Sequence, residues 1–277
     1  MKRAMTATAL VLLVLGCAPK QEVAEYSRTV RAVNLDVDVN EEMMTVSWQR
    51  SGEGMIGGYN IYISEEPLAK DYPSAVVKPS FEPFNGEPFP GDTNPDDGVE
   101  YFVAEGLEDG VKYYVSVRVV YPDGSVSKPS NEVVAVCGPR GEIELSVRYN
   151  GEHDGFSFDK NEYVNADAVD NDLYFFSRES EETLNSPEKL NGFLRRNRLL
   201  ILPFRGSLDE VSSELANTPM TATENSVKVK VGDWVLIQTP EDKNALVNVL
   251  SFSGEPGKDR KVRLFFAFST LTGEAIF

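Results

Sequence analysis

The sequence predicts a mainly β protein with two domains. Apolar and polar residues alternate with a period of two in many short runs, most clearly over residues 112–120, where Tyr113, Val115 and Val117 share one face. Clusters of Gly, Pro, Asn and Asp separate these runs. The 277 residues, 41% of them apolar, are enough for roughly two packed domains. We therefore expect an N-terminal β-sandwich followed by a C-terminal β-rich (α+β) domain with an antiparallel meander and short helices.

The first half of the chain has the spacing of a β-sandwich, which is about seven short strands with turn signals between them. The residues of 121–125 (Tyr-Pro-Asp-Gly-Ser) form a turn signal, and a return strand is expected to begin at Val126. The other strands are expected at residues 33–39, 44–50, 56–64, 99–104 and 132–136.

Several motifs in this half resemble a fibronectin type III domain. They are Trp48 in the second expected strand, Tyr-Asn-Ile-Tyr at 59–62 in the third, Leu107-x-x-Gly110-x-x-Tyr113, and Ser-Lys-Pro-Ser-Asn-Glu-Val at 127–133. The resemblance covers residues 30–137. It implies that Trp48 packs at the centre of the core and that the Tyr113 hydroxyl bonds back to the backbone. It implies no activity, because this sandwich serves as a spacer, an adhesion module and a receptor domain alike.

Residues 79–98 are an insertion relative to that family and are rich in Pro, Gly and acidic residues. Long loops in compact domains are usually functional or disordered. The insertion contains three phenylalanines, Phe81, Phe84 and Phe89, which argue against full disorder. They are expected to pack on the sandwich or the second domain, or else to form an exposed contact surface.

A weak calcium motif lies in the same insertion. Asp92, Asn94 and Asp96 occupy alternate positions, as calcium-binding loops require. However, Gly98 comes one residue late, Pro95 occupies the fourth position and Val103 stands where a Glu is needed. An acidic Asn-Pro turn is the alternative, so no metal site is predicted.

The second domain is expected over residues 141–277, after the Gly-Pro boundary at 137–141. Ser186-Pro187-Glu188 predicts the start of a short helix with Leu190, Phe193 and Leu194 on its apolar face. Residues 207–210 (Ser-Leu-Asp-Glu) are a capping box that predicts a helix to about residue 216. The run at 227–231 is expected to turn at 232–233 into the strand 234–237, followed by strands at 246–252 and 261–268.

This half resembles β-rich domains of uncharacterised bacterial lipoproteins, on Gly-Phe-Ser-Phe at 155–158, Asp-Leu-Tyr-Phe at 172–175 and Gly-Asp-Trp-Val at 232–235. It is distantly similar to haem-capturing surface lipoproteins of the Bacteroidetes. Haem capture needs axial ligands, usually His or Met. After Met55 only His153 and Met220 are available, and nothing in the sequence pairs them.

The first residues predict a secretory leader. Met1-Lys2-Arg3 is basic, and a short apolar run follows to Leu15, too short for a transmembrane helix. Val-Leu-Gly-Cys at 14–17 resembles a bacterial lipobox, which implies a signal peptide at 1–16, fatty acylation (palmitate) of Cys17 and a tether at 17–29. Ala18 is not the Asp linked to inner-membrane retention, so the resemblance implies the outer membrane. An ordinary signal peptide with an incidental Cys is the alternative.

Composition excludes some functions. The formal net charge of −17 repels nucleic acid and anionic lipid surfaces. The chain contains one histidine and no nucleophile elbow, phosphate loop or cysteine cluster. A pair of carboxylates for glycoside hydrolysis remains open, because such pairs are distant in sequence. Cys137 is expected to be a shielded structural thiol.

We therefore expect a membrane-anchored, non-enzymatic lipoprotein that acts as an interaction or spacer module at the cell envelope, with no cofactor and no metal. Its partners would be the lipid bilayer, through acylated Cys17, and an envelope protein or glycan. A carbohydrate-binding module or glycosidase is the first alternative, and a haem or metal carrier is the second.

Overall fold

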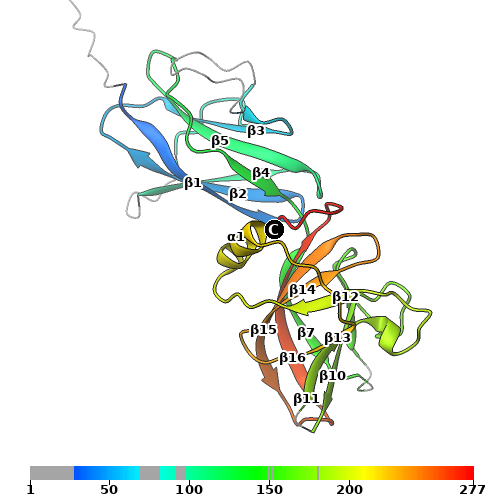
Figure 1. Ribbon diagram of the computed structural model, residues 1–277. Coiled ribbons are helices and arrows are strands. Elements are labelled where there is room, and N and C mark those ends of the chain that lie inside the picture. The colour runs from blue at the N-terminus through cyan, green and yellow to red at the C-terminus, as the bar shows by residue number, and fades with distance from the viewer. Residues whose placement is uncertain (1–27, 69–81, 92–97, 149, 151, 180) are drawn as a thin grey trace, which may run out of the picture.

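The computed structural model describes residues 28–68, 82–91, 98–148, 150, 152–179 and 181–277. They form two β domains arranged end to end, with the single described α-helix and the C-terminus at the junction (Figure 1). All strand pairs within the sheets are antiparallel. The predicted mainly β fold class is confirmed.

The N-terminal domain is a sandwich of two three-stranded sheets. One has the order β1 (Arg31–Asn40), β2 (Met43–Ser51), β4 (Val99–Glu105), and the other has the order β3 (Gly58–Ser64), β5 (Lys112–Val120), β6 (Val133–Val136). Alternate residues of both sheets point inward and form one core. Trp48 is fully buried in it and makes an edge-to-face contact with Tyr59, with 5.0 Å between the ring centroids.

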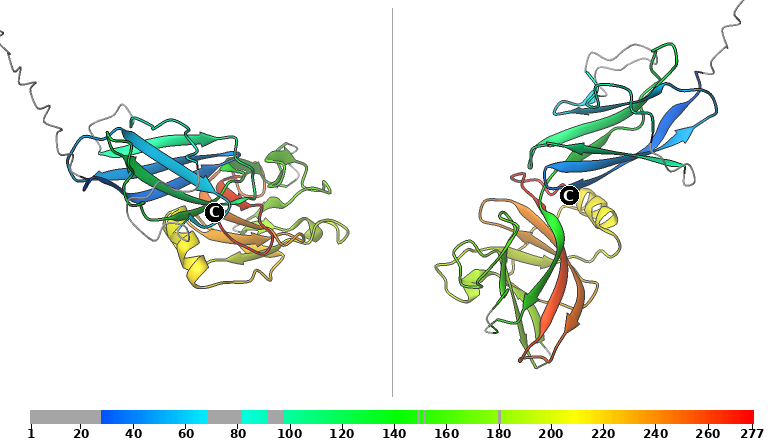
Figure 2. Two further views of the ribbon diagram at one scale, coloured as in Figure 1. Left: turned by 90° about the horizontal axis from the view of Figure 1, so that it is seen from above. Right: turned by 180° about the vertical axis from the view of Figure 1, so that it is seen from behind.

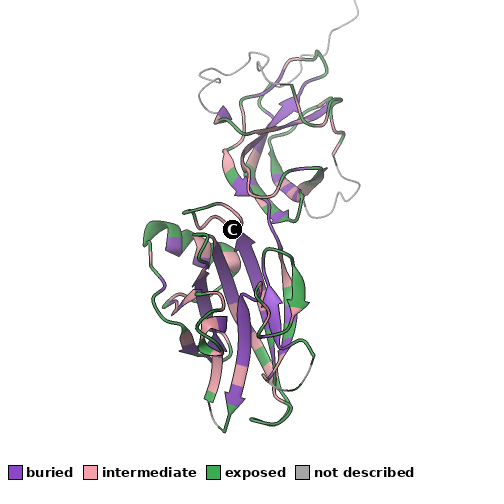
Figure 3. Cartoon of the chain, turned by 90° about the vertical axis from the view of Figure 1, so that its right-hand side faces the viewer, coloured by how far each residue is buried: buried purple, intermediate pink, exposed green. Residues whose placement is uncertain are grey.

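The C-terminal domain is a second sandwich, of two five-stranded sheets. One sheet has the order β13 (Ser226–Lys228), β11 (Glu181–Asn185), β10 (Leu173–Arg178), β8 (Gly155–Ser157), β9 (Glu162–Val164). The other has the order β12 (Arg198–Ile201), β14 (Trp234–Gln238), β15 (Asn244–Ser253), β16 (Lys261–Ser269), β7 (Arg140–Ser146). A core of twenty buried hydrophobic residues from both sheets lies between them, and Figure 3 shows the buried residues along these strands in purple.

The capping box is confirmed. α1 (Leu208–Asn217) begins where Ser207 accepts a hydrogen bond from the Glu210 amide and the Glu210 side chain accepts from the Ser207 amide. The helix covers the outer face of the β12–β14–β15 sheet, where Val211 and Leu215 join a small cluster with Trp234. No described helix has the length and apolar character needed to cross a bilayer.

Three local predictions were wrong. The run at 227–231 does not form a hairpin with 234–237, because β13 pairs with β11 in one sheet while β14 pairs with β12 and β15 in the other. The predicted helix from Ser186 is only the 3-10 turn η2 (Pro187–Lys189), and Phe193 is 98% exposed. Val126 makes one isolated bridge to Val120, and the strand that pairs with β5 is β6.

The insertion packs, as far as it is described, on the N-terminal sandwich. Phe89 contacts Trp48 and Phe102, and its backbone forms a bridge with Tyr59. The Asn85 side chain accepts from the Ile61 amide at 2.9 Å and donates to the Tyr59 carbonyl at 2.9 Å. The segment therefore occupies the outer edge of β3 and protects it from pairing with another chain.

Candidate functional site

The junction between the domains is held by backbone contacts. The Gly138 amide donates to the Asn40 carbonyl at 3.2 Å, and the Phe268 amide donates to the Pro139 carbonyl at 2.9 Å. A Cβ on Gly138 would lie 2.5 Å from the Phe268 carbonyl oxygen, so the two backbone segments lie too close together for any residue other than glycine. The views in Figure 2 show the C-terminal segment (red) and α1 (yellow) where the two domains meet.

A second set of junction contacts is electrostatic. Lys112 of β5 pairs with Glu274 of the C-terminal segment at 2.6 Å. Arg140 is 12% exposed and pairs with Asp38 of β1 at 3.4 Å. Burial raises the pKa of Asp209, at the start of α1, and the charges of Asp36 and Asp38 raise it further. The junction therefore joins β1, β5, β7, α1 and the C-terminal segment.

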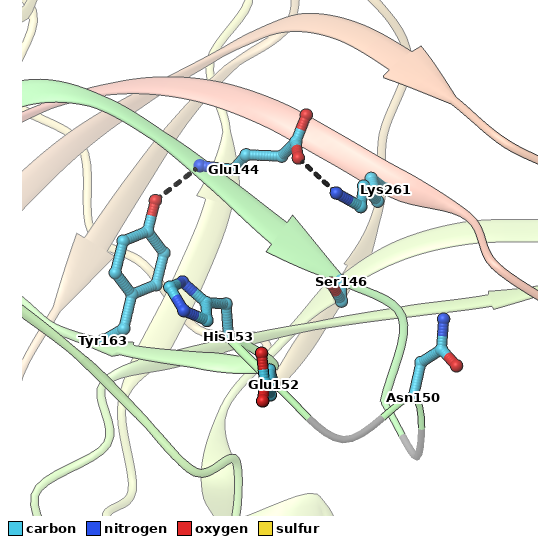
Figure 4. A pocket seen from close by; sticks show the side chains of 7 residues that line it. All are labelled: Glu144, Ser146, Asn150, Glu152, His153, Tyr163 and Lys261. Carbon is cyan, nitrogen blue, oxygen red and sulfur yellow. Dashed lines mark hydrogen bonds and ion pairs between the residues drawn. The ribbon is translucent and has the colours of Figure 1, made fainter.

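One hollow lies beside β7, and Figure 4 shows the side chains that line it. It measures about 740 Å³ and includes His153, Tyr163 and Glu144 in its lining. The rings of His153 and Tyr163 lie 4.1 Å apart, and the Tyr163 hydroxyl accepts from the Glu144 amide at 2.9 Å. Glu144 also pairs with Lys261 at 2.6 Å. These side chains are exposed and bonded to one another, so they cap a sheet edge and form no nucleophile–base pair.

A second hollow, of about 620 Å³, lies on the outer face of the β13–β11–β10 sheet. The register places Tyr174, Asn185 and Ser226 in one row across the three strands. Phe176, Thr183 and Lys228 form the next row. We call this set the outer-sheet groove; its rim includes Arg148, Glu181, Lys189, Leu190 and Asn225. The intervening residues Phe175, Leu184 and Val227 point the other way, into the core.

Hydrogen bonds hold the centre of the groove in one arrangement. The Ser226 hydroxyl donates to Asn185 Oδ1 at 2.7 Å, and Asn185 Nδ2 donates to Thr183 Oγ1 at 3.0 Å. The Thr183 hydroxyl donates to the Phe176 carbonyl at 3.3 Å. Asn185 is buried and Phe176 is partly exposed. A row of uncharged polar groups thus stands beside an accessible aromatic ring.

Charges in the groove are compensated locally. Lys228 pairs with Glu181. Arg148 pairs with Asp154 at 2.9 Å, and Asp154, with 4% of its side chain exposed, also accepts from the Ala166 amide at 2.8 Å. Lys228 and Arg148 are therefore compensated, and Lys189 on the rim is the lining cation for which the described residues show no ion pair.

The match to a known protein family lies in the first domain. The fibronectin type III domain family matches residues 26–136.

This part of the chain is a fibronectin type III domain.

Its Tyr113 behaves as the resemblance implied, since the hydroxyl accepts from the Glu108 amide at 3.0 Å. No curated protein matches the chain. Among solved structures it is similar to the twitchin kinase region from C. elegans, at 13% identity and a TM-score of 0.25. That alignment covers 82% of this chain and 37% of that one, so the chain spans little more than a third of the solved protein.

Several residues singled out in the sequence lie outside the described residues. They are Cys17, the predicted acylation site, and Asp92, Asn94 and Asp96, the weak calcium candidates. Within the described part, no three His, Cys, Asp or Glu side chains are grouped so that they could hold a metal ion.

The remaining candidates are placed. His153 lines the hollow at the β7 edge, whereas Met220 lines a different pocket beside α1, so the two do not form a common haem site. Cys137 is fully buried beside the fibronectin type III core, and its Sγ lies 3.4 Å from the Met43 carbonyl oxygen. Burial raises the pKa of this thiol to about 11, which keeps it protonated and unreactive at neutral pH.

Sequence reasoning missed the outer-sheet groove. Its parts come from strands that are distant in sequence, and the outward-facing residues of β10 and β11 were not recognised as one surface. The available signal was the alternation of Tyr174 and Phe176 with the core residue Phe175.

Proposed function

We propose that the chain is a lipid-anchored, non-catalytic interaction protein of the cell envelope. The fibronectin type III domain is the observation that carries the proposal, because the family serves as an interaction module and the matched residues follow directly on the lipobox-like leader. Acyl chains on Cys17 hold the protein at the outer membrane, with more than one chain needed for stable attachment.

The domain junction supports a spacer role. Both domains contribute backbone hydrogen bonds and ion pairs to it, so the fibronectin type III domain can hold the C-terminal sandwich in a set orientation. Relative motion of domains is the default unless their interface is large and hydrophobic, and in this junction the backbone hydrogen bonds and the close approach at Gly138 oppose that motion. The C-terminal sandwich is then the part that meets a partner.

The non-catalytic assignment rests on chemistry. The single histidine is exposed, and its ring is tilted by 49° against that of Tyr163. Ser146 lines the same hollow, but the described residues show no hydrogen bond between its hydroxyl and the His153 ring. Burial raises the pKa of the Cys137 thiol, so it stays protonated at neutral pH and supplies no thiolate nucleophile.

The test is fatty-acid labelling in cells, followed by separation of membranes. Wild-type protein should carry the label and sediment with the outer membrane. Cys17→Ser should lose the label, because its hydroxyl cannot form the thioether. Cys137→Ala is the matched control and should keep the label. Recovery of unlabelled wild-type protein in the soluble fraction, or label retained by Cys17→Ser, would overturn the anchor.

A further inference from the structure

We propose that the outer-sheet groove binds an uncharged oligosaccharide. The inference rests on the proposed interaction role and names the chemical class of the partner. The groove is a hollow of about 620 Å³, within the range of about 300–1,000 Å³ that is usual for ligand sites. It joins an accessible aromatic ring, Phe176, to a row of amide and hydroxyl groups.

The lining fits the two kinds of surface that a sugar ring presents. One face of a pyranose carries C–H groups, which pack against an aromatic ring, and its rim carries hydroxyl groups, which need donors and acceptors together. Phe176 supplies the ring, while the exposed Asn225 side chain and the partly exposed Ser226 hydroxyl supply amide and hydroxyl groups.

The hydrogen bonds within the row lower the entropic cost of binding. Ser226, Asn185 and Thr183 are already bonded to one another, so their side chains have little rotamer freedom to lose when a ligand arrives. Asn185 is buried, which fixes the row further.

The charged side chains around the groove favour an uncharged ligand over an acidic one. Lys228 and Arg148 are each paired with a carboxylate, which leaves Lys189 on the rim as the one lining cation without an ion pair among the described residues. One such lysine is not the cluster of cations that an acidic polymer needs. The chain carries a net charge of −17, which repels polyanions as they approach.

Geometry disfavours a peptide strand. A peptide that extends a sheet needs an unpaired strand edge. The groove lies on the face of three hydrogen-bonded strands. The central strand, β11, is paired with β10 on one side and β13 on the other, so its backbone has no unpaired edge for a peptide to join.

The test is affinity electrophoresis and calorimetry with the full chain in a detergent that contains no sugar. The probes are neutral polysaccharides (glucans, xylan and mannan), with polygalacturonate and alginate as acidic comparators. We expect at least one neutral probe to retard the protein and its affinity to stay the same between low and high salt. Phe176→Ala should weaken that binding about tenfold, as expected for truncation of a central aromatic contact.

Phe84→Ala is the matched control, because Phe84 is 41% exposed and lies in the other domain. It should leave the affinity unchanged. The proposal is overturned if no neutral probe binds, if Phe176→Ala binds as well as wild type, or if only acidic probes bind and salt abolishes that binding. The purified protein is used, so failure here leaves the membrane anchor untouched, and the labelling experiment tests that anchor separately.

Discussion

Replacing Gly138 with alanine tests whether the two domains are held as closely in solution as the junction contacts imply. The new Cβ would lie 2.5 Å from the Phe268 carbonyl oxygen. An ordinary contact begins near 3.4 Å, so this oxygen must retreat by about 0.9 Å. A similar movement of the Phe268 amide would stretch its 2.9 Å hydrogen bond to Pro139 beyond bonding distance.

The expected cost is about 1–3 kcal/mol of the free energy of unfolding, the usual range for an extra methyl group in a packed site. Gly192→Ala is the control, because a Cβ there meets nothing within 4 Å, and its effect should stay within about 0.5 kcal/mol. Urea unfolding measures the stability, and small-angle scattering measures the spread of the two domains. If Gly138→Ala matches Gly192→Ala in both measurements, the close junction does not exist in solution.

Two further predictions concern single side chains. Tyr113→Phe should lower the free energy of unfolding by about 1–2 kcal/mol, because the Glu108 amide loses its acceptor at a buried corner. Tyr163→Phe, at an exposed edge, should leave the free energy of unfolding nearly unchanged. Equal losses for the two variants in urea unfolding would refute the role of Tyr113 at this corner. Burial and neighbouring aspartates raise the pKa of Asp209 above its ordinary 3.8, so its ionisation costs stability as pH rises from about 4 through that raised value. Asp209→Asn cannot ionise and should therefore gain more over wild type at pH 7 than at pH 4 in urea unfolding; the same difference at both pH values would contradict this.

Local signals in the sequence predicted the elements that local chemistry decides. Alternation over 112–120 identified β5, because the period of two places one face in the core. Ser207 and Glu210 identified the start of α1, since a capping box lies within four residues. Trp48 and Tyr113 were placed by motif, and both are where the fibronectin type III pattern implied.

Pairing between distant strands could not be predicted in the same way. Alternation shows which side chains share a face, but it does not show which strand lies next. Residues 227–237 read as a hairpin, yet β13 and β14 lie in different sheets because each finds its partner elsewhere. The segment after Ser186 has helical spacing, but Phe193 points into solvent and has no surface to pack on.

The outer-sheet groove lies in the second domain, so its orientation relative to the first domain depends on the junction. β10, β11 and β13 lie in the domain farther from the N-terminal end of the chain (Figure 1). The twelve residues 18–29 can span at most about 40 Å, even when fully extended. The orientation of the second sandwich relative to the first is set by contacts that resist bending, and these include the backbone bonds at Gly138 and Pro139. A loosened junction would therefore change the orientation of the groove relative to the first domain, while the intrinsic affinity of the groove for a ligand stayed the same, since Phe176 and Asn185 lie outside the junction contacts.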